Sequence, residues 1–215
     1  MGLDITVMVV DWSWLGEVPA PERLSRLWCA WDADETGLWD YEAPTVRGDW
    51  AWPKGPHSDR FAVYEFLYTL GSYKPHFWVT HHWDHVRDHA DPSLRAELDD
   101  FLLGLIWDGP DGESGRTDLE FFASTATESA DAPPCGTSLL LARSPEGVRE
   151  LAATWERVHP LLDGLREPYA KHTAAVSSDG RPADFDHGFV HLLTEWARVL
   201  TEAADRGWGV VGVKG

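Results

Sequence analysis

The chain has 215 residues, of which 43% are hydrophobic and 12% aromatic, so it can bury a substantial core and fits a single domain over residues 1–215. Its 36 acidic residues outnumber its 18 basic ones, and the net charge of -18 would repel nucleic acid and anionic membranes. The partners that remain are a basic protein, a cation or a small molecule.

The two cysteines indicate the compartment. Cys29 and Cys135 belong to no metal-ligand or redox motif, which is typical of a reducing environment. The first ten residues lack the features of a signal peptide, and no apolar run reaches the ~18 residues that a membrane span needs. We therefore expect a cytoplasmic protein.

The N-terminal part of the chain predicts a strand followed by a helix. Residues 3–10 are rich in β-branched side chains and predict a mostly buried strand. Pro21 suits the first turn of a helix, whose apolar face repeats as Leu24, Leu27, Trp28 and Trp31. Residues 32–56 mix acidic residues, tryptophans and prolines, and predict a long irregular loop of the kind that often carries function.

The rest of the chain alternates between strands and helices. Residues 61–68, 138–143 and 208–213 predict strands, and helices are predicted from about Thr80, from Pro92 to Leu105, from Pro145, over 160–169 and over 185–204. The strands at both chain ends most easily satisfy their backbone hydrogen-bonding groups when they lie in one sheet. We therefore expect an α+β fold, with a small mixed sheet that includes both terminal strands and is packed by four to six helices.

Both ends of the chain carry a further pattern. Met1-Gly2 leads into a strand and a short helix, and the last helix runs through Trp196-Ala197-Arg198 into Ala204-Asp205-Arg206-Gly207-Trp208-Gly209-Val210-Val211. These terminal quarters resemble the ends of the YfbM-like proteins, a bacterial family of unknown function. The resemblance implies an α+β fold, and it assigns no functional residue.

Five of the ten histidines lie between His76 and His89. On a helix, His81, His85 and His89 form a stripe beside the apolar face. Histidines at i and i+4 can chelate one ion, so His81 with His85, or His85 with His89, predicts a site for zinc or another transition metal, with a further ligand from elsewhere. The alternative is a solvated or partly packed histidine face.

The last predicted helix repeats this spacing with His187 and His191. Both histidines lie opposite the apolar stripe of that helix, which favours exposure to water. If the histidine-rich helix covered them, they could join its metal site together with Asp184. A nearby carboxylate, Asp84 or Asp88, would then be the general base of a metal-dependent hydrolase.

Aromatic side chains suggest two other binding surfaces. Trp39, Trp50 and Trp52 lie in the acidic loop, where they either cover the core or form a recognition surface for a basic protein. A small-molecule pocket is the other possibility, with walls made of Tyr68, Tyr73, Trp78 and Trp83.

Three classes of function follow from these patterns. The preferred one is an acidic binding or regulatory protein, for example of the immunity type, that grips a basic protein. The alternatives are the metal-dependent hydrolase and a small-molecule-binding protein with an aromatic pocket. No phosphate-binding loop and no hydrolase nucleophile motif is present in the sequence.

Overall fold

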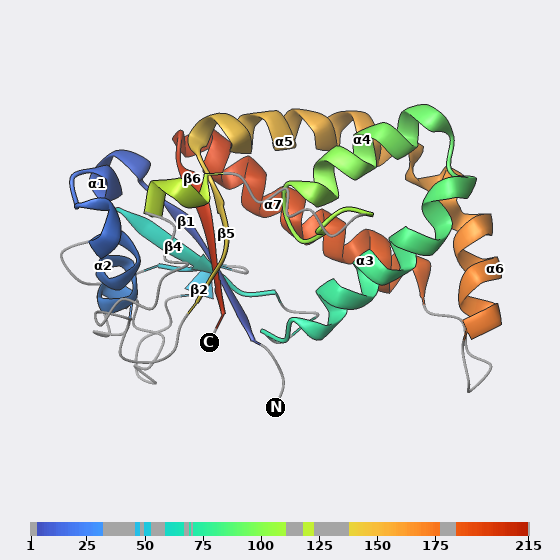
Figure 1. Cartoon of the computed structure of the whole chain (residues 1–215), viewed down its shortest axis with the longest axis horizontal. Coiled ribbons are helices and arrows are strands. Elements are labelled where there is room, and N and C mark those ends of the chain that lie inside the picture. The colour runs from blue at the N-terminus through green and yellow to red at the C-terminus, as the bar shows by residue number, and fades with distance from the viewer. Residues whose placement is uncertain are drawn as a thin grey trace.

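The computed structural model describes residues 4–31, 46–47, 50–52, 59–66, 69, 71–110, 118–122, 138–176 and 184–214. Six strands form one sheet in the order β2-β3-β4-β1-β6-β5. Their bounds are β1 (Ile5–Val10), β2 (Val46–Arg47), β3 (Trp50–Ala51), β4 (Phe61–Tyr64), β5 (Ser138–Arg143) and β6 (Gly209–Lys214). The predicted α+β fold is confirmed, and the two terminal strands β1 and β6 pair side by side within the sheet (Figure 1).

The described pairings are all antiparallel, so the expectation of a mixed sheet was wrong. The helices explain the direction of the last two strands. Helix α5 (Pro145–Val158) leads away from the end of β5, and α7 (His191–Arg206) packs against α5 and returns. As a result β6 starts beside the residue where β5 ended, with Val210 opposite Arg143.

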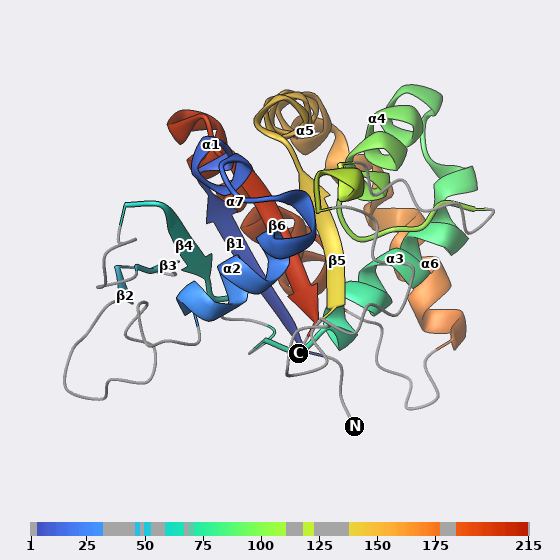
Figure 2. The same cartoon turned by 60° about the vertical axis from the view of Figure 1, so that its left-hand side comes forward.

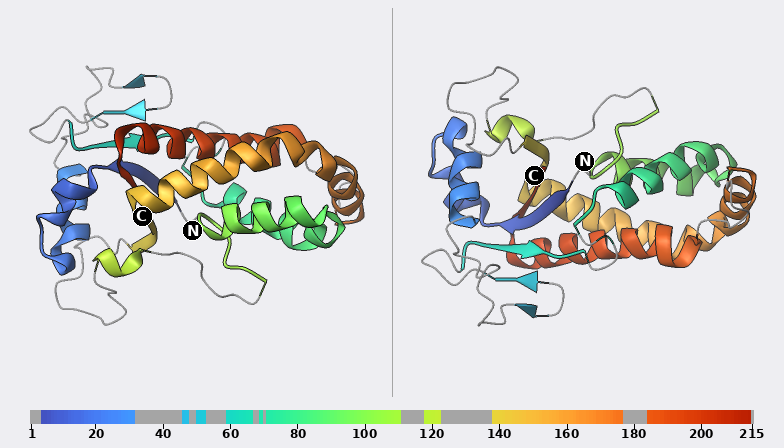
Figure 3. Two further views of the ribbon diagram at one scale, coloured as in Figure 1. Left: turned by 90° about the horizontal axis from the view of Figure 1, so that it is seen from above. Right: turned by 90° about the horizontal axis from the view of Figure 1, so that it is seen from below.

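The other helices are α1 (Trp12–Gly16), α2 (Arg23–Ala30), α3 (Lys74–Val86), α4 (Pro92–Leu103) and α6 (Arg166–Val176). Shorter turns are η1 (Ala20–Glu22), η3 (Arg87–His89), η4 (Leu119–Phe122), η5 (His159–Leu165) and the π-helical η6 (Phe185–Val190). Seen from above, α5 and α7 run side by side and α6 lies at the end distant from the sheet (Figure 3). None of the described helices is long and apolar enough to cross a membrane.

The sheet separates two hydrophobic clusters. Along β1, Val7 and Val9 face the larger cluster, which is completed by α3, α4, α5 and α7. Met8 and Val10 point the other way, toward α1 and α2. This follows from the alternation of side chains along a strand, since β1 is apolar on both faces and is covered on both. Figure 2 shows α1 and α2 in front of the strands and α7 behind them.

Helix α3 begins earlier than the sequence suggested. It starts at Lys74, with Pro75 in its first turn, rather than near Thr80. The predicted apolar face is confirmed, because Val79, Trp83 and Val86 are buried in the larger cluster.

The sequence analysis placed Trp83 in the wall of a small-molecule pocket. In the structure this side chain is instead fully buried in the core. Its indole Nε1 donates a hydrogen bond of 2.8 Å to Oδ1 of Asp99 on α4. This bond satisfies the one polar atom that the buried ring carries.

Candidate functional site

Helix α3 exposes two neighbouring aromatic side chains. Phe77 is 53% exposed and Trp78 is 44% exposed. In the part of the chain that the structure describes, one other large hydrophobic side chain is classed as exposed, Leu161 on η5. The aromatic pair stands out because it is contiguous and because each member borders a pocket.

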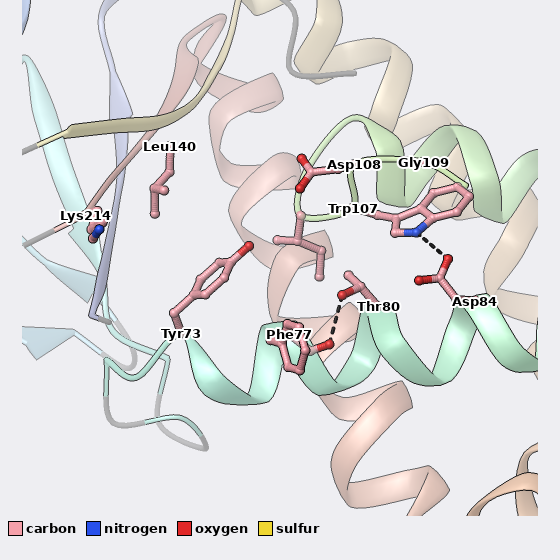
Figure 4. Close-up of a pocket in the computed structure, with 10 residues that line it drawn as sticks. Tyr73, Phe77, Thr80, Asp84, Trp107, Asp108, Gly109, Leu140 and Lys214 are labelled. Carbon is pink, nitrogen blue, oxygen red and sulfur yellow. Dashed lines mark hydrogen bonds between the residues drawn. The ribbon is translucent and has the colours of Figure 1, made fainter. Parts of the chain in front are cut away.

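The first pocket lies between α3 and the segment that follows α4 (Figure 4). It has a volume of about 350 Å³, within the usual range for ligand sites. Figure 4 shows Lys214 and Leu140 on the strand side, Asp84 and Trp107 on the opposite side, and the Tyr73 hydroxyl directed between them. The lining consists of Tyr73, Phe77, Thr80, Asp84, Ile106, Trp107, Asp108, Gly109, Leu140 and Lys214.

Hydrogen bonds fix the side chains on the α3 side of this pocket. The Trp107 Nε1 donates to Oδ1 of Asp84 at 2.8 Å, which orients the carboxylate. The guanidinium of Arg87 lies over the Trp107 ring, 5.2 Å from its centroid, and also donates to Asp99. That hydrogen bond raises the pKa of Arg87, so the positive charge over the indole is permanent.

The second pocket lies on the other side of α3 and has a volume of about 430 Å³. Trp78 borders it, as does His82, whose side chain is only 7% exposed. Asp184 also lines it, but its Oδ1 already accepts from the backbone N–H groups of Asp186 and His187. The described residues that line it are Lys74, Pro75, Trp78, Val79, His82, Tyr169, Asp184 and Gly188.

Four histidines from two helices meet beside the second pocket. His172 on α6 stacks on His85, with ring centroids 4.6 Å apart, and lies 5.5 Å from His82. His81 lies 4.6 Å from His85, whose Nδ1 is 2.8 Å from the backbone carbonyl of His81. We call His81, His82, His85 and His172 the histidine cluster.

Burial keeps part of this cluster uncharged. Removal from water is the main cause that lowers the pKa of His82 to about 4, and the neighbouring imidazoles add to it. The pKa of His172 is lowered by the same two causes. Nδ1 of His82 and Nε2 of His172 are buried, and neither has a hydrogen-bond partner among the described residues.

A third buried histidine, His76, lies outside the cluster at the start of α3. Its ring stacks on Tyr73 and meets the edges of Phe66 and Trp196. Among the described residues, neither ring nitrogen has a partner within hydrogen-bonding geometry. Burial lowers the pKa of His76 to about 4, although the nearby backbone of Ser72 opposes this shift. The aromatic packing therefore requires a neutral imidazole.

The predicted metal ligands do not come together as one site. Among the described residues, no group of three or more histidine, cysteine, aspartate or glutamate side chains is placed to hold a metal ion. His81 and His85 are neighbours, as predicted, whereas His89 lies exposed in η3. His187 is exposed in η6, and His191 lies 3.7 Å from Glu195 on its own helix.

The two predicted general bases differ in their surroundings. Asp84 lines the first pocket, whereas Asp88 is an exposed carboxylate that forms a 2.9 Å ion pair with Arg95. Asp88 is therefore engaged at the protein surface, away from the lining of both pockets.

The loop tryptophans that the structure describes cover the core. Trp50 lies in β3 with its ring 4.8 Å from Tyr64, edge to face, and Trp52 packs beside it under the guanidinium of Arg206. Both are half-buried and pack against the larger hydrophobic cluster, and their predicted role in recognition stays a prediction. Trp39 and Tyr68 lie outside the described residues.

Compared with models of known protein families, with curated proteins and with solved structures, the chain matches none. The candidate site is therefore defined by its own geometry alone.

Sequence reasoning missed several residues of the pockets. Phe77 and Thr80 were overlooked because the helix was expected to start at Thr80, although Pro75 marks its first turn and Tyr73, Phe77, Thr80 and Asp84 follow helical spacing. His172, Asp108 and Lys214 come from other elements, and no local pattern brings them to α3.

Proposed function

We propose that the protein is a binding protein that recognises a basic protein partner through the exposed face of α3. The observation that carries this proposal is the pair Phe77 and Trp78, which are adjacent, exposed, and bordered on each side by a pocket. Large aromatic side chains beside pockets are typical of the energetic centre of a protein interface. A cytoplasmic location belongs to the same proposal.

Charge supports a basic partner. The chain carries a net charge of -18, and carboxylates lie in the linings of both pockets, Asp84 and Asp108 in the first and Asp184 in the second. Such a surface attracts a positively charged partner and accelerates its association, most strongly at low salt.

Metal-dependent hydrolysis has less support. The described residues offer no group of three ligands, and Asp88 is engaged with Arg95. We therefore do not advance the hydrolase, and the first pocket serves the proposed binding function.

The proposal is tested by affinity capture from a lysate of the source organism. The wild-type protein is compared with the double variant Phe77→Ser, Trp78→Ser. We expect the wild type to retain a protein with a pI above about 9, and the double variant to lose it. Retention should also weaken as salt is raised, because the two surfaces carry opposite charge.

The matched control is Leu161→Ser, which removes an exposed apolar side chain of 42% exposure from η5, outside both pocket linings. This variant should capture the same partner as the wild type. Identical capture by the double variant, or a captured partner that is acidic, would show that α3 is not the recognition surface.

A further inference from the structure

We propose that the first pocket receives the guanidinium group of an arginine residue in the partner protein. The inference rests on the proposed function and names the partner side chain that this pocket selects. It combines three features of the lining, namely aromatic walls, two carboxylates that come from different segments, and a hydrogen bond that holds one of these carboxylates in place.

The walls of the pocket suit a flat cation. Tyr73, Phe77 and Trp107 all line it, and aromatic faces attract a positive charge. Guanidinium is planar and weakly hydrated, so it stacks on such rings more readily than a lysine ammonium does. The apolar stem of arginine would contact Ile106 and Leu140, which complete the walls.

The carboxylates supply the charge that arginine needs. Asp84 is held by the Trp107 indole through Oδ1, and a carboxylate oxygen can accept more than one hydrogen bond. Asp108 lies in the same lining (Figure 4). Guanidinium can donate two parallel hydrogen bonds to one carboxylate, a geometry that lysine lacks.

Lys214 limits which ligands fit. It is the basic residue among the described lining residues and lies on the strand side, away from Asp84 (Figure 4). A cation is therefore drawn toward Asp84 on α3, and Asp108, on the segment that follows α4, adds a second negative charge to the described lining. This polarity favours one orientation, with the guanidinium toward Asp84 and the peptide backbone toward the opening.

The test uses defined probes and isothermal titration calorimetry. The probes are acetyl-arginine amide, acetyl-lysine amide, acetyl-citrulline amide and agmatine. Citrulline keeps the shape of arginine and removes its charge. We expect acetyl-arginine amide to bind at least about tenfold more tightly than the citrulline probe, because a charged hydrogen bond is lost, and more tightly than the lysine probe.

The variants are Asp84→Asn and Asp108→Asn, alone and combined. Asparagine at position 84 keeps an oxygen that can accept from Trp107 Nε1, so the wall stays in place while the charge is removed. The combined variant should bind acetyl-arginine amide about tenfold or more weakly than the wild type does. The control Asp88→Asn removes one negative charge, as each single variant does, at an exposed residue of η3 outside the described pocket lining, and it should bind as the wild type does.

Three results would overturn the inference. They are equal binding of the citrulline probe, unchanged binding in the combined variant, and tighter binding of agmatine than of acetyl-arginine amide, which would assign the pocket to a free small molecule. Each is independent of the Phe77 and Trp78 capture experiment. If capture depends on Phe77 and Trp78 but the pocket does not prefer arginine, the proposed binding function is supported and the arginine pocket is refuted.

Discussion

The ring of His172 on α6 stacks on the ring of His85 on α3, with centroids 4.6 Å apart, although the two helices are distant in the sequence. Together with the contact between His82 and Tyr169, this pair forms part of the interface between α3 and α6. Helix α3 also carries the exposed aromatic pair and borders both pockets. The state of its histidines therefore bears on the proposed recognition surface.

Acid should loosen the attachment of α3. The folded-state pKa of both His76 and His82 is about 4, below the 6.5 of an exposed histidine, so both stay neutral in the fold while the unfolded chain takes up protons as the pH falls. Stability is thus complete above about pH 6.5 and is lost toward pH 4. For the deeply buried His76 the loss between about pH 7.5 and pH 5 is about 2 kcal/mol, and for His82, which is closer to solvent, it is smaller. Urea denaturation at the two pH values measures this loss.

The matched variant for this measurement is His76→Phe, His82→Phe, which keeps an aromatic ring at both positions. Its stability should change less between the two pH values than that of the wild type. An equal loss in both proteins would mean that groups other than these two histidines control the acid response.

Metal should be absent from the purified, untagged protein at stoichiometric level. Among the described residues, no three suitable ligand side chains are brought together. Elemental analysis after dialysis should give well below one equivalent of zinc or any other transition metal. One equivalent that disappears in the variant His81→Ala, His85→Ala would instead establish a metal site.

Asp99 should be a strong determinant of stability. Its carboxylate accepts from the Trp83 indole and from Arg87, so it joins α4 to the end of α3. Asp99→Ala leaves a buried N–H and a largely buried guanidinium without this partner, and we expect a loss of about 2 to 3 kcal/mol in the free energy of unfolding. Asp100→Ala, an exposed neighbour on the same helix, should change it by less than about 0.5 kcal/mol. Similar losses in the two variants would contradict this role.

Gly209 permits a close approach between β6 and α1. A Cβ atom at this position would lie 2.1 Å from the Trp12 ring and 2.7 Å from the backbone oxygen of Arg143. We expect Gly209→Ala to destabilise the fold by about 1 to 3 kcal/mol through overpacking. A Cβ atom at Gly164 would meet open space, so Gly164→Ala should leave the free energy of unfolding unchanged in the same denaturation experiment. If Gly209→Ala also left it unchanged, the close approach would be refuted.

The positions of many elements could be predicted from the sequence because they follow from local spacing. The strand over 138–143 agrees with β5, and the helix from Pro92 agrees with α4 within two residues. The buried face of α3 was predicted for the same reason, since each residue turns about 100° along a helix whatever surrounds it. The short strands β2 and β3 fall in the expected loop, where two-residue strands leave no periodic pattern.

Only the tertiary structure decided which distant side chains meet. The amino-acid sequence by itself determined the α+β class, the acidic surface and the concentration of histidines on one helix. It did not determine that His172 joins this helix, that Asp108 and Lys214 line a pocket with Asp84, or that Trp50 and Trp52 cover the core. These contacts depend on how helices and strands pack against one another, and packing is set by the whole core rather than by the period of any one segment.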